Sequence, residues 1–460
     1  MEEVDVAIVG GGPGGSAAGR AAALNGADVV VFERGVPRAD RDELGPDSTD
    51  AAGFLDYWVD IAGIDPDTIP EGVIQQVLDQ AEFNGPSESL TLRETGFDTS
   101  YPNFGFTFHR ARFDDWLRDR AEDAGAEYRV GSGVRSIDVA QNRTGTHRLS
   151  LADGSSVEAT SLILADGPQR QQTMPVLDAY LPESKKAKDL LSPRTANHVA
   201  YQEYRRFPED VFEPRTLKFW WGWIPGHTAY PWIFPNQERI GRVGLTMPIG
   251  IERADLARPT DYTLVRKEDE TLPTPSEYIR RLLDRLYGDE YDIASDFPVL
   301  TDDHGKDEGT ETYAISSTRP IESPTDLNIA VVGGAMGATS AFHEGGDHLA
   351  LRTGALAGEL AATDSLSMYN QAWQEAVGAE VLRNVALAEL VRGYRPPDWD
   401  RVLAIGRRML RKGDGGIPVL SSALSTGISA LRLYVSYRWQ RFKYGSGRFC
   451  QIQESDYRIE

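Results

Sequence analysis

Three glycines near the N-terminus have a spacing that suits phosphate binding. They stand as Gly10-x-Gly12-x-x-Gly15, with Pro13 inside the turn, between an apolar stretch typical of a buried strand and an Ala-rich stretch typical of a helix. Gly10 permits the tight turn, Gly12 lets the backbone approach a pyrophosphate, and Gly15 lets the helix pack on the strand. Because free N–H groups at the helix N-terminus face such phosphates, the pattern predicts a dinucleotide site.

An acidic residue ends the second apolar strand. Glu33 lies 18 residues after Gly15, where its carboxylate can accept hydrogen bonds from ribose hydroxyls and would repel a 2′-phosphate. The neighbouring Arg34 completes the predicted cofactor contacts of this segment. A glycine-rich turn without a ligand is the alternative, and the strand, helix and acid in register disfavour it. These features alone do not distinguish NAD from FAD.

Two further segments resemble those of p-hydroxybenzoate-hydroxylase-type flavoproteins. Residues 110–117 match the R-x-x-F-D-x-x-L segment that precedes a helix near FAD, and residues 165–167 match an A-D-G segment where a strand ends beside the cofactor. Each alone is also found at ordinary helix starts and turns, but their order and spacing favour the flavoprotein. The resemblance implies FAD as the cofactor and assigns Arg110, Asp166 and Gly167 to its binding.

A third segment, 328–337, resembles the G-D-A-A-G region of the same flavoproteins. Gly334 stands where the Asp of that region meets the ribityl chain, and Ala341 stands where a proline is expected. The resemblance implies that Gly334, Gly345 and Gly346 border the flavin, with the N-terminus of the following helix facing its pyrimidine edge. The alternative is a second, NADPH-binding turn, but no acid-tipped strand follows it.

Aromatic residues are concentrated in one part of the chain. Seven of them fall within positions 219–234, whereas aromatics make up 9% of the whole sequence. Tyr230-Pro-Trp232-Ile-Phe234-Pro and a later Val-Gly resemble the Y-x-W-x-F-P…V-G motif of geranylgeranyl reductases, FAD enzymes that saturate isoprenoid double bonds. The resemblance covers residues 1 to about 375. The residues expected in an apolar substrate pocket are Trp221, Trp223, Tyr230, Trp232 and Phe234. Simple aromatic core packing is the alternative.

Saturating an alkene needs a hydride, which reduced FAD offers, and a proton from an acid. His343 and Glu344 lie in the loop predicted to border the flavin, so they are the candidate catalytic residues; a solvated Glu344 and a helix-capping His343 are the alternative. Some geranylgeranyl reductases carry a Cys-Gly pair where this chain has Leu44-Gly45, which excludes a thiol mechanism.

Two rival functions share the FAD core. A flavin-dependent monooxygenase or halogenase is suggested by residues 221–225, which approximate the halogenase W-x-W-x-I-P motif with one residue missing. A non-catalytic flavin-binding or lipid- or quinone-binding protein is favoured if Gly334 has weakened cofactor binding. The electron donor of the reductase is left open among ferredoxin, a flavodoxin and NAD(P)H.

The resemblance to these flavoproteins implies an α/β fold in which a Rossmann-like FAD-binding domain carries an inserted antiparallel β-sheet domain for the substrate, followed by a helical C-terminal region. The FAD-binding domain is predicted to consist of 1–75, 100–172 and 312–375. The substrate domain is predicted at 76–99 and 173–311, and the helical region at 376–460.

Composition limits the remaining classes. The net charge of −22 makes nucleic acid an improbable partner, and the acidic surplus with its Arg bias suggests a high-salt cytoplasm. The single cysteine excludes an internal disulfide and a thiolate metal site, so no metal is predicted. The N-terminus lacks a secretory pattern, which predicts a cytoplasmic protein. Residues 415–453 hold no Asp or Glu and interleave basic with aromatic residues, which suggests peripheral docking on the inner membrane face.

Overall fold

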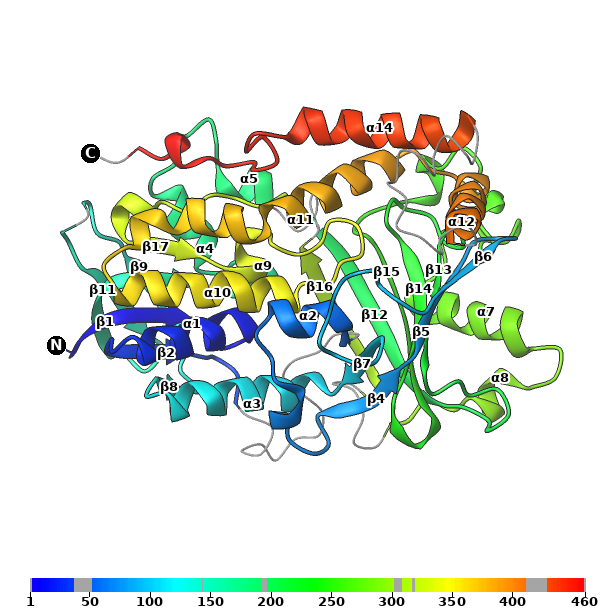
Figure 1. The fold of residues 1–460 in the computed structure, drawn as a ribbon, viewed down its shortest axis with the longest axis horizontal. Helices are drawn as coiled ribbons and strands as arrows, with labels where there is room; N and C mark the ends of the chain where they lie inside the picture. Colours follow the sequence, from blue (N-terminus) through cyan, green and yellow to red (C-terminus); the bar gives the residue numbers. More distant parts are fainter. Residues whose placement is uncertain are drawn as a thin grey trace.

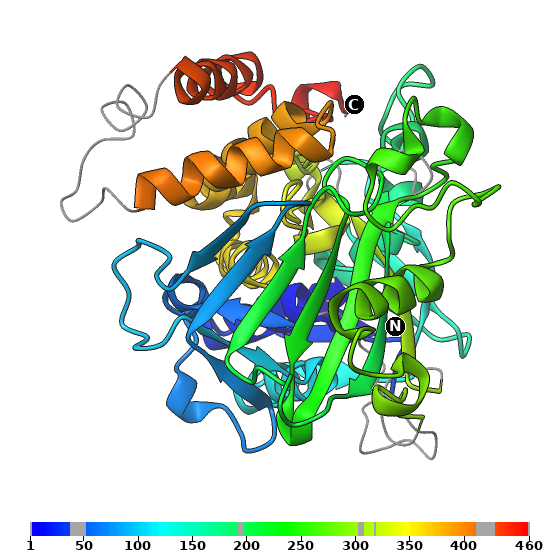
Figure 2. The same ribbon diagram turned by 90° about the vertical axis from the view of Figure 1, so that its right-hand side faces the viewer.

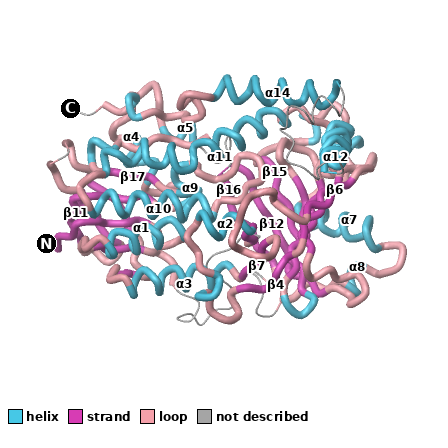
Figure 3. The backbone as a smooth tube through the Cα atoms, viewed as in Figure 1, coloured by secondary structure: helices cyan, strands magenta, loops and turns pink. Residues whose placement is uncertain are grey.

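The strands of the protein gather in two large sheets, with helices around and between them (Figures 1 and 3). A computed structural model describes residues 2–36, 52–142, 144–191, 197–301, 308–316, 319–410 and 428–458. The predicted class, a Rossmann-like α/β unit with an inserted β-sheet unit and a helical C-terminal region, is confirmed. Leu44 and Gly45 lie outside the described residues.

The first sheet is mostly parallel and is built from apolar strands. Its spatial order is β8 (Glu127–Arg129), β2 (Val29–Phe32), β1 (Glu2–Val9), β11 (Ser156–Leu164), β10 (His147–Leu151) and β9 (Val134–Asp138), with β17 (Ile329–Val331) paired to the end of β11. The Val, Ile and Leu side chains of the parallel strands are buried in the largest core cluster of the molecule. Continuous apolar runs are what a parallel sheet needs, because it is covered on both faces.

Two helices next to this sheet touch backbone to backbone. A Cβ atom on Gly354 of α10 (Asp347–Ala362) would lie 2.0 Å from the carbonyl oxygen of Gly14 in α1 (Pro13–Leu24). A Cβ atom on Gly358 would lie 2.1 Å from the carbonyl oxygen of Ala18. Only glycine allows this approach. The contact keeps α10 close to the glycine turn, while α3 (Arg110–Asp123) packs on α1 as well.

The second sheet is antiparallel except where β13 pairs with β5. Its order is β16 (Thr310–Ser316), β12 (Asn197–Arg206), β15 (Ile240–Pro248), β14 (Tyr230–Pro235), β13 (Thr216–Trp220), β5 (Gln80–Asn84) and β6 (Ser89–Leu92). One face packs against α7 (Pro275–Tyr287), which lies across the strands in Figure 2 and is followed by α8 (Ile293–Asp296). The other face, called here the aromatic face, carries the side chains of Tyr230, Trp232 and Phe234.

A small sheet and several helices lie around these two units. The small sheet holds β3 (Gly53–Leu55), β7 (Gly105–Phe108) and β4 (Ile74–Leu78), and α2 (Asp56–Ile61) follows β3 directly. Helices α4 (Thr173–Asp178) and α5 (Ala187–Leu191) pack in the core of the first sheet. Residues 173–191, assigned to the substrate half from the sequence, therefore lie with the first sheet, while β16 extends the second sheet to residue 316.

The C-terminal region covers the molecule and then returns to it. Helices α11 (Tyr369–Val391) and α14 (Ile428–Tyr444) run alongside each other, and α12 (Pro396–Leu410) contacts β6 (Figure 1). After α14, the side chains of Phe449 and Ile452 join the core of the first sheet. None of the helices in the described ranges combines the length and the apolarity needed to cross a membrane.

Candidate functional site

The glycine turn after β1 leaves space for a ligand at one of its glycines. Gly10 has φ +102°, a conformation that favours glycine. A Cβ atom on Gly15 would lie 1.8 Å from the carbonyl oxygen of Gly10, because α1 begins directly against the turn. A Cβ atom on Gly12 would meet no protein atom within 4 Å. The residues present therefore fit a dinucleotide: open space lies at the glycine whose backbone is expected to approach the pyrophosphate.

Glu33 follows β2 and turns back toward the glycine turn. Its Oε2 atom accepts a hydrogen bond from the backbone N–H of Gly11 at 2.6 Å, and its Oε1 atom accepts one from Gly35 at 2.6 Å. The carboxylate is thereby fixed at the edge of the turn, where an adenosine ribose would lie in a dinucleotide site. The neighbouring Arg34 donates to the side chain of Gln171 at 3.1 Å.

The residues of the two flavoprotein-like segments lie near the same turn. Asp166 accepts backbone hydrogen bonds from Gln172 at 2.7 Å and Thr173 at 3.0 Å, so it caps α4. Gly167 has φ +68°, and a Cβ atom there would meet no protein atom within 4 Å. The side chain of Arg110 is held by two carboxylates, Asp114 at 2.8 Å and Asp347 at 3.3 Å, the latter being the first residue of α10.

Gly334 lies in the short helix α9 (Gly333–Met336) after β17. A Cβ atom there would lie 3.2 Å from the ring of Pro168 and 3.4 Å from its backbone nitrogen. The Gly334 carbonyl accepts a hydrogen bond from the buried side chain of Arg170 at 3.0 Å. Pro168 therefore crowds a side chain at this position, which is a physical reason for the glycine.

The loop before α10 places the two predicted catalytic residues differently. His343 accepts a hydrogen bond on Nδ1 from the backbone N–H of Gly345 at 3.2 Å, and its ring lies 5.4 Å from that of Trp58. Burial lowers the pKa of His343 to about 3, so its imidazole is neutral at neutral pH. Gly346 is the N-cap of α10, and a Cβ atom on it would press on Thr339.

Glu344 lies in a buried polar cluster rather than in solvent. Its backbone is left-handed, with φ +62°, and its side chain points to the second sheet. Oε2 accepts a hydrogen bond from the Thr246 hydroxyl, and Oε1 accepts one from Thr228 at 3.3 Å. Oε1 also lies 2.5 Å from Nδ1 of His198, which is 2% exposed. Residues of three distant segments thus surround one carboxylate, a cluster called here the Glu344 cluster.

The aromatic face meets this loop. Tyr230, Trp232 and Phe234 are each buried and share one side of β14, because alternate residues of a strand point the same way. The Tyr230 hydroxyl donates to the carbonyl of His343 at 2.6 Å, and burial raises its pKa well above the usual value, so it stays a donor. The Trp232 ring lies flat over Gly244, where a Cβ atom would come within 2.5 Å of it.

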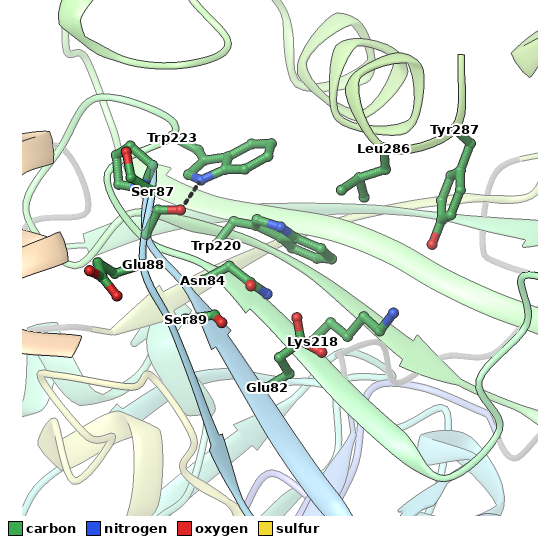
Figure 4. Close-up of a pocket in the computed structure, with 12 residues that line it drawn as sticks. Glu82, Asn84, Ser87, Glu88, Ser89, Lys218, Trp220, Trp223, Leu286 and Tyr287 are labelled. Atoms are coloured by element: carbon green, nitrogen blue, oxygen red, sulfur yellow. Dashed lines mark hydrogen bonds between the residues drawn. The ribbon is translucent and has the colours of Figure 1, made fainter. Parts of the chain in front are cut away.

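The sheet separates Trp223 from the other two tryptophans of the predicted pocket, Trp221 and Trp232. Trp221 packs on the aromatic face, with Tyr230 at 5.7 Å and Trp399 of α12 at 5.0 Å. Trp223 lies with the opposite face, in the cluster beneath α7, and its indole N–H donates to the carbonyl of Gly85 at 2.9 Å. It borders a polar cavity of about 380 Å³ together with Trp220, Lys218 and Tyr287 (Figure 4).

Sequence reasoning missed four residues of this site. Three of them, His198, Thr228 and Thr246, complete the Glu344 cluster. The fourth, Trp399, covers Trp221 from the C-terminal region. None of them belongs to a motif that the sequence analysis used. The alternation of β12 and β15 was the available signal, since it places polar residues on the face that carries the aromatic motif.

The fold and the glycine cradle together define a class of protein. Residues 5–166 match the model of the family described as FAD dependent oxidoreductase. The predicted enzyme class, an FAD-dependent oxidoreductase, and the predicted cofactor, FAD, are confirmed.

Several relatives carry the name digeranylgeranylglycerophospholipid reductase. The chain is 27% identical over 390 residues, 82% of its own length and 83% of the relative's, to a protein of Methanopyrus kandleri named digeranylgeranylglycerophospholipid reductase 2. Among solved structures it resembles a geranylgeranyl bacteriochlorophyll reductase-like protein of Thermoplasma acidophilum, with TM-score 0.65, 20% identity and coverage of 96% and 98%. A myxobacterial chondrochloren halogenase shares the fold with TM-score 0.58, 18% identity and coverage of 96% and 97%. The resemblance to geranylgeranyl reductases is confirmed.

Proposed function

We propose that this FAD-dependent oxidoreductase saturates isoprenoid double bonds of a membrane lipid or a related prenyl compound. One observation carries the proposal. The aromatic face contacts the loop before α10, because the Tyr230 hydroxyl donates a hydrogen bond to the His343 carbonyl. The apolar chain of an isoprenoid could therefore bind against buried aromatic rings. These rings lie beside the N-terminus of α10, which is expected to border the flavin. The name of the Methanopyrus relative supports the same substrate class.

Different residues would have different roles in such a reaction. When bound and reduced, FAD supplies a hydride. The rings of Tyr230, Trp232 and Phe234 exclude water and hold the apolar chain in one orientation, which an unpolarised double bond requires. The polar groups of the Glu344 cluster lie next to these rings and are available for proton transfer.

The test of this function is anaerobic reduction of a digeranylgeranyl lipid by the purified flavoprotein. Dithionite reduces the flavin, so that the identity of the natural electron donor, whether ferredoxin, a flavodoxin or NAD(P)H, does not affect the result. We expect lipid mass spectra to show the gain of two hydrogens per reduced bond. Turnover only with oxygen, giving a hydroxylated or halogenated product, would support the rival oxygenase function and overturn the reductase.

We also propose that helix α14 docks the enzyme on the membrane that holds its lipid. Val435, Trp439 and Phe442 are 57%, 64% and 67% exposed, and their spacing places them on one side of the helix. Trp439 and Phe442 stack at 6.0 Å, and Arg438 and Lys443 lie next to them in the sequence. Exposed aromatics flanked by cations suit the interface of an anionic lipid bilayer.

Liposome flotation tests this docking. Deleting 415–460 would remove Phe449 and Ile452 from the core, so point variants are the better probe. We expect Trp439→Ser/Phe442→Ser to abolish flotation with anionic liposomes while retaining flavin. Leu24→Ser, at another exposed apolar position, is the control and should float like the wild type. Unchanged flotation of the double variant would contradict the docking.

A further inference from the structure

One nitrogen of the Glu344 cluster has no partner within the described residues. His198 is 2% exposed, and its Nδ1 atom lies 2.5 Å from Glu344, but its Nε2 atom is buried without a hydrogen bond. A buried polar atom of this kind costs free energy unless a ligand or water satisfies it. The unpartnered atom therefore marks a place where a bound molecule is expected to meet the protein.

The position of His198 places it beside the aromatic face. His198 and Ala200 are two residues apart in β12, so their side chains lie on the same side of the sheet. Ala200 belongs to the cluster of Tyr230 and Trp232, and it pairs across the sheet with Thr246. The imidazole therefore lies at the end of the aromatic face that is nearest to the loop before α10.

The two residues predicted from the sequence are less suited to give a proton. Burial lowers the pKa of His343 to about 3, so at neutral pH it carries no extra proton. Both oxygens of Glu344 accept hydrogen bonds, from Thr246 and Thr228 hydroxyls, and one also faces His198. An ionised carboxylate is an acceptor only, which fits a group that orients a donor rather than one that loses a proton itself.

We infer that His198 donates the proton in the reduction and that Glu344 is the positioning residue that holds its imidazolium. The inference rests on the proposed function. In the step, a hydride from reduced flavin forms a C–H bond at one alkene carbon, and the π electrons of the alkene form the second C–H bond with the proton of Nε2. Flavin is oxidised, the alkene is reduced, and His198 is left neutral until a solvent proton returns to it.

Two ionisable side chains, those of Glu344 and His227, face the His198 ring. Glu344 faces Nδ1, and the ring of His227, from the segment between β13 and β14, lies 5.3 Å away in an edge-on contact. Burial, followed by the charges of His198 and Arg392, lowers the pKa of His227 to about 4, while Glu344 and Glu389 oppose the shift. His227 is therefore uncharged at neutral pH, and the Glu344 side chain is the acidic group that contacts the His198 ring.

A matched pair of histidine variants tests the role in the reduced holoenzyme. We expect His198→Gln to bind FAD normally and to lose at least about 100-fold in prenyl reduction, the usual size of a general-acid contribution. His227→Gln makes the same change in a neighbouring ring and should keep activity within about threefold. The His227 ring is neutral and meets His198 edge-on, whereas it is His198 whose Nδ1 atom lies 2.5 Å from Glu344. Glu344→Gln should lower prenyl reduction and retain flavin, since it weakens the contact that fixes the orientation of the His198 ring.

Nitrogen NMR of the histidines gives a readout that does not depend on turnover. With ¹⁵N-histidine-labelled holoenzyme, we expect Nε2 of His198 to carry a proton in the wild type, and we expect the signature of the Nδ1 hydrogen bond to Glu344 to disappear in Glu344→Gln. This measurement tests the role of His198 as the proton donor even if the His198→Gln variant fails to fold. An Nε2 atom without a proton in the wild type, or full activity of His198→Gln beside an active wild type, would overturn the role. A wild type that reduces no prenyl lipid overturns the proposed function and this role with it.

Discussion

The two regions proposed to bind ligands in this molecule are built in opposite ways. The glycine turn makes space by leaving side chains out: a Cβ atom on Gly12 would meet no protein atom within 4 Å. The aromatic face is instead filled with large rings, and it leaves buried nitrogen atoms without partners in the described chain, namely Nε1 of Trp221 and Trp232 and Nε2 of His198. The first region recognises its ligand through backbone and shape, and the second offers apolar surface with a few unsatisfied polar atoms.

This difference predicts which kind of substitution harms each region. Adding atoms to the glycine turn should block the ligand, because the proposed cofactor would occupy the space there. Removing atoms from the aromatic face should harm the reaction, because its rings are proposed to hold the substrate. The following variants test whether the two regions separate in this way.

The largest effect is expected from a valine in the glycine turn. Gly12→Val should lose flavin almost completely while the flavin-free protein keeps its fold, because its Cβ atom meets only empty space in the protein. Gly15→Val should lose the fold itself, since its Cβ atom would lie 1.8 Å from the carbonyl of Gly10. Absorbance of bound flavin and circular dichroism measure the two outcomes. Purified Gly12→Val with a full complement of flavin would place the cofactor elsewhere.

The next effect separates the two faces of the second sheet. Trp232→Ala on the aromatic face should lower prenyl reduction by at least about 100-fold and retain flavin. The prenyl chain of the substrate would lose the ring that is proposed to orient it. Trp220→Ala removes an equally buried ring from the face beneath α7, and it should cost about 3–5 kcal/mol of stability while the folded fraction stays active. Product mass spectra and thermal unfolding measure both. Equal activity loss in the two variants would favour simple core packing for Trp232.

The parts of this site that could be predicted from the sequence are those built by neighbouring residues. The glycine turn and Glu33 lie close together in the chain, and their contact needs only one strand–helix–strand unit. In the Glu344 cluster, Glu344 contacts Thr246, which is 98 positions away in the sequence, and Thr228, which is 116 positions away. No short motif records how these distant segments pair. The pairing of Trp223 with α7 likewise depends on which face of the sheet each helix covers. Long-range packing, and not local propensity, decided these parts.

A smaller effect is expected at the position where related flavoproteins carry Asp. Gly334→Asp should destabilise the protein by about 1–3 kcal/mol, because its Cβ atom would lie 3.2 Å from the Pro168 ring and the carboxylate needs still more room. We expect no gain in flavin affinity. Ala in place of Gly334 is the matched control and should cost less, since it adds the Cβ atom alone. Tighter flavin binding by Gly334→Asp at unchanged stability would show that the space is free.

The smallest effect compares His198 with another buried histidine, His147. His147 has both ring nitrogens occupied, one accepting from the Ala140 N–H at 3.3 Å and the other bonded to the Leu327 carbonyl at 2.9 Å. Burial lowers the pKa of His147 from 6.5 to about 4. Between these values the unfolded chain binds a proton that the folded chain does not, so stability is lost as pH falls below 6.5.

For one such histidine, the loss between pH 6.5 and 5.5 is about 1 kcal/mol. His147→Gln should therefore remove about this much of the pH dependence of urea unfolding, and it should leave the pH profile of catalysis unchanged. His198→Gln should do the reverse: it should lower activity by at least about 100-fold across the profile and leave that slope in place, because the slope comes from His147. If both variants changed the unfolding slope alike, the two histidines would have the same structural role, and the contrast between a packed ring and a chemically active one would not hold.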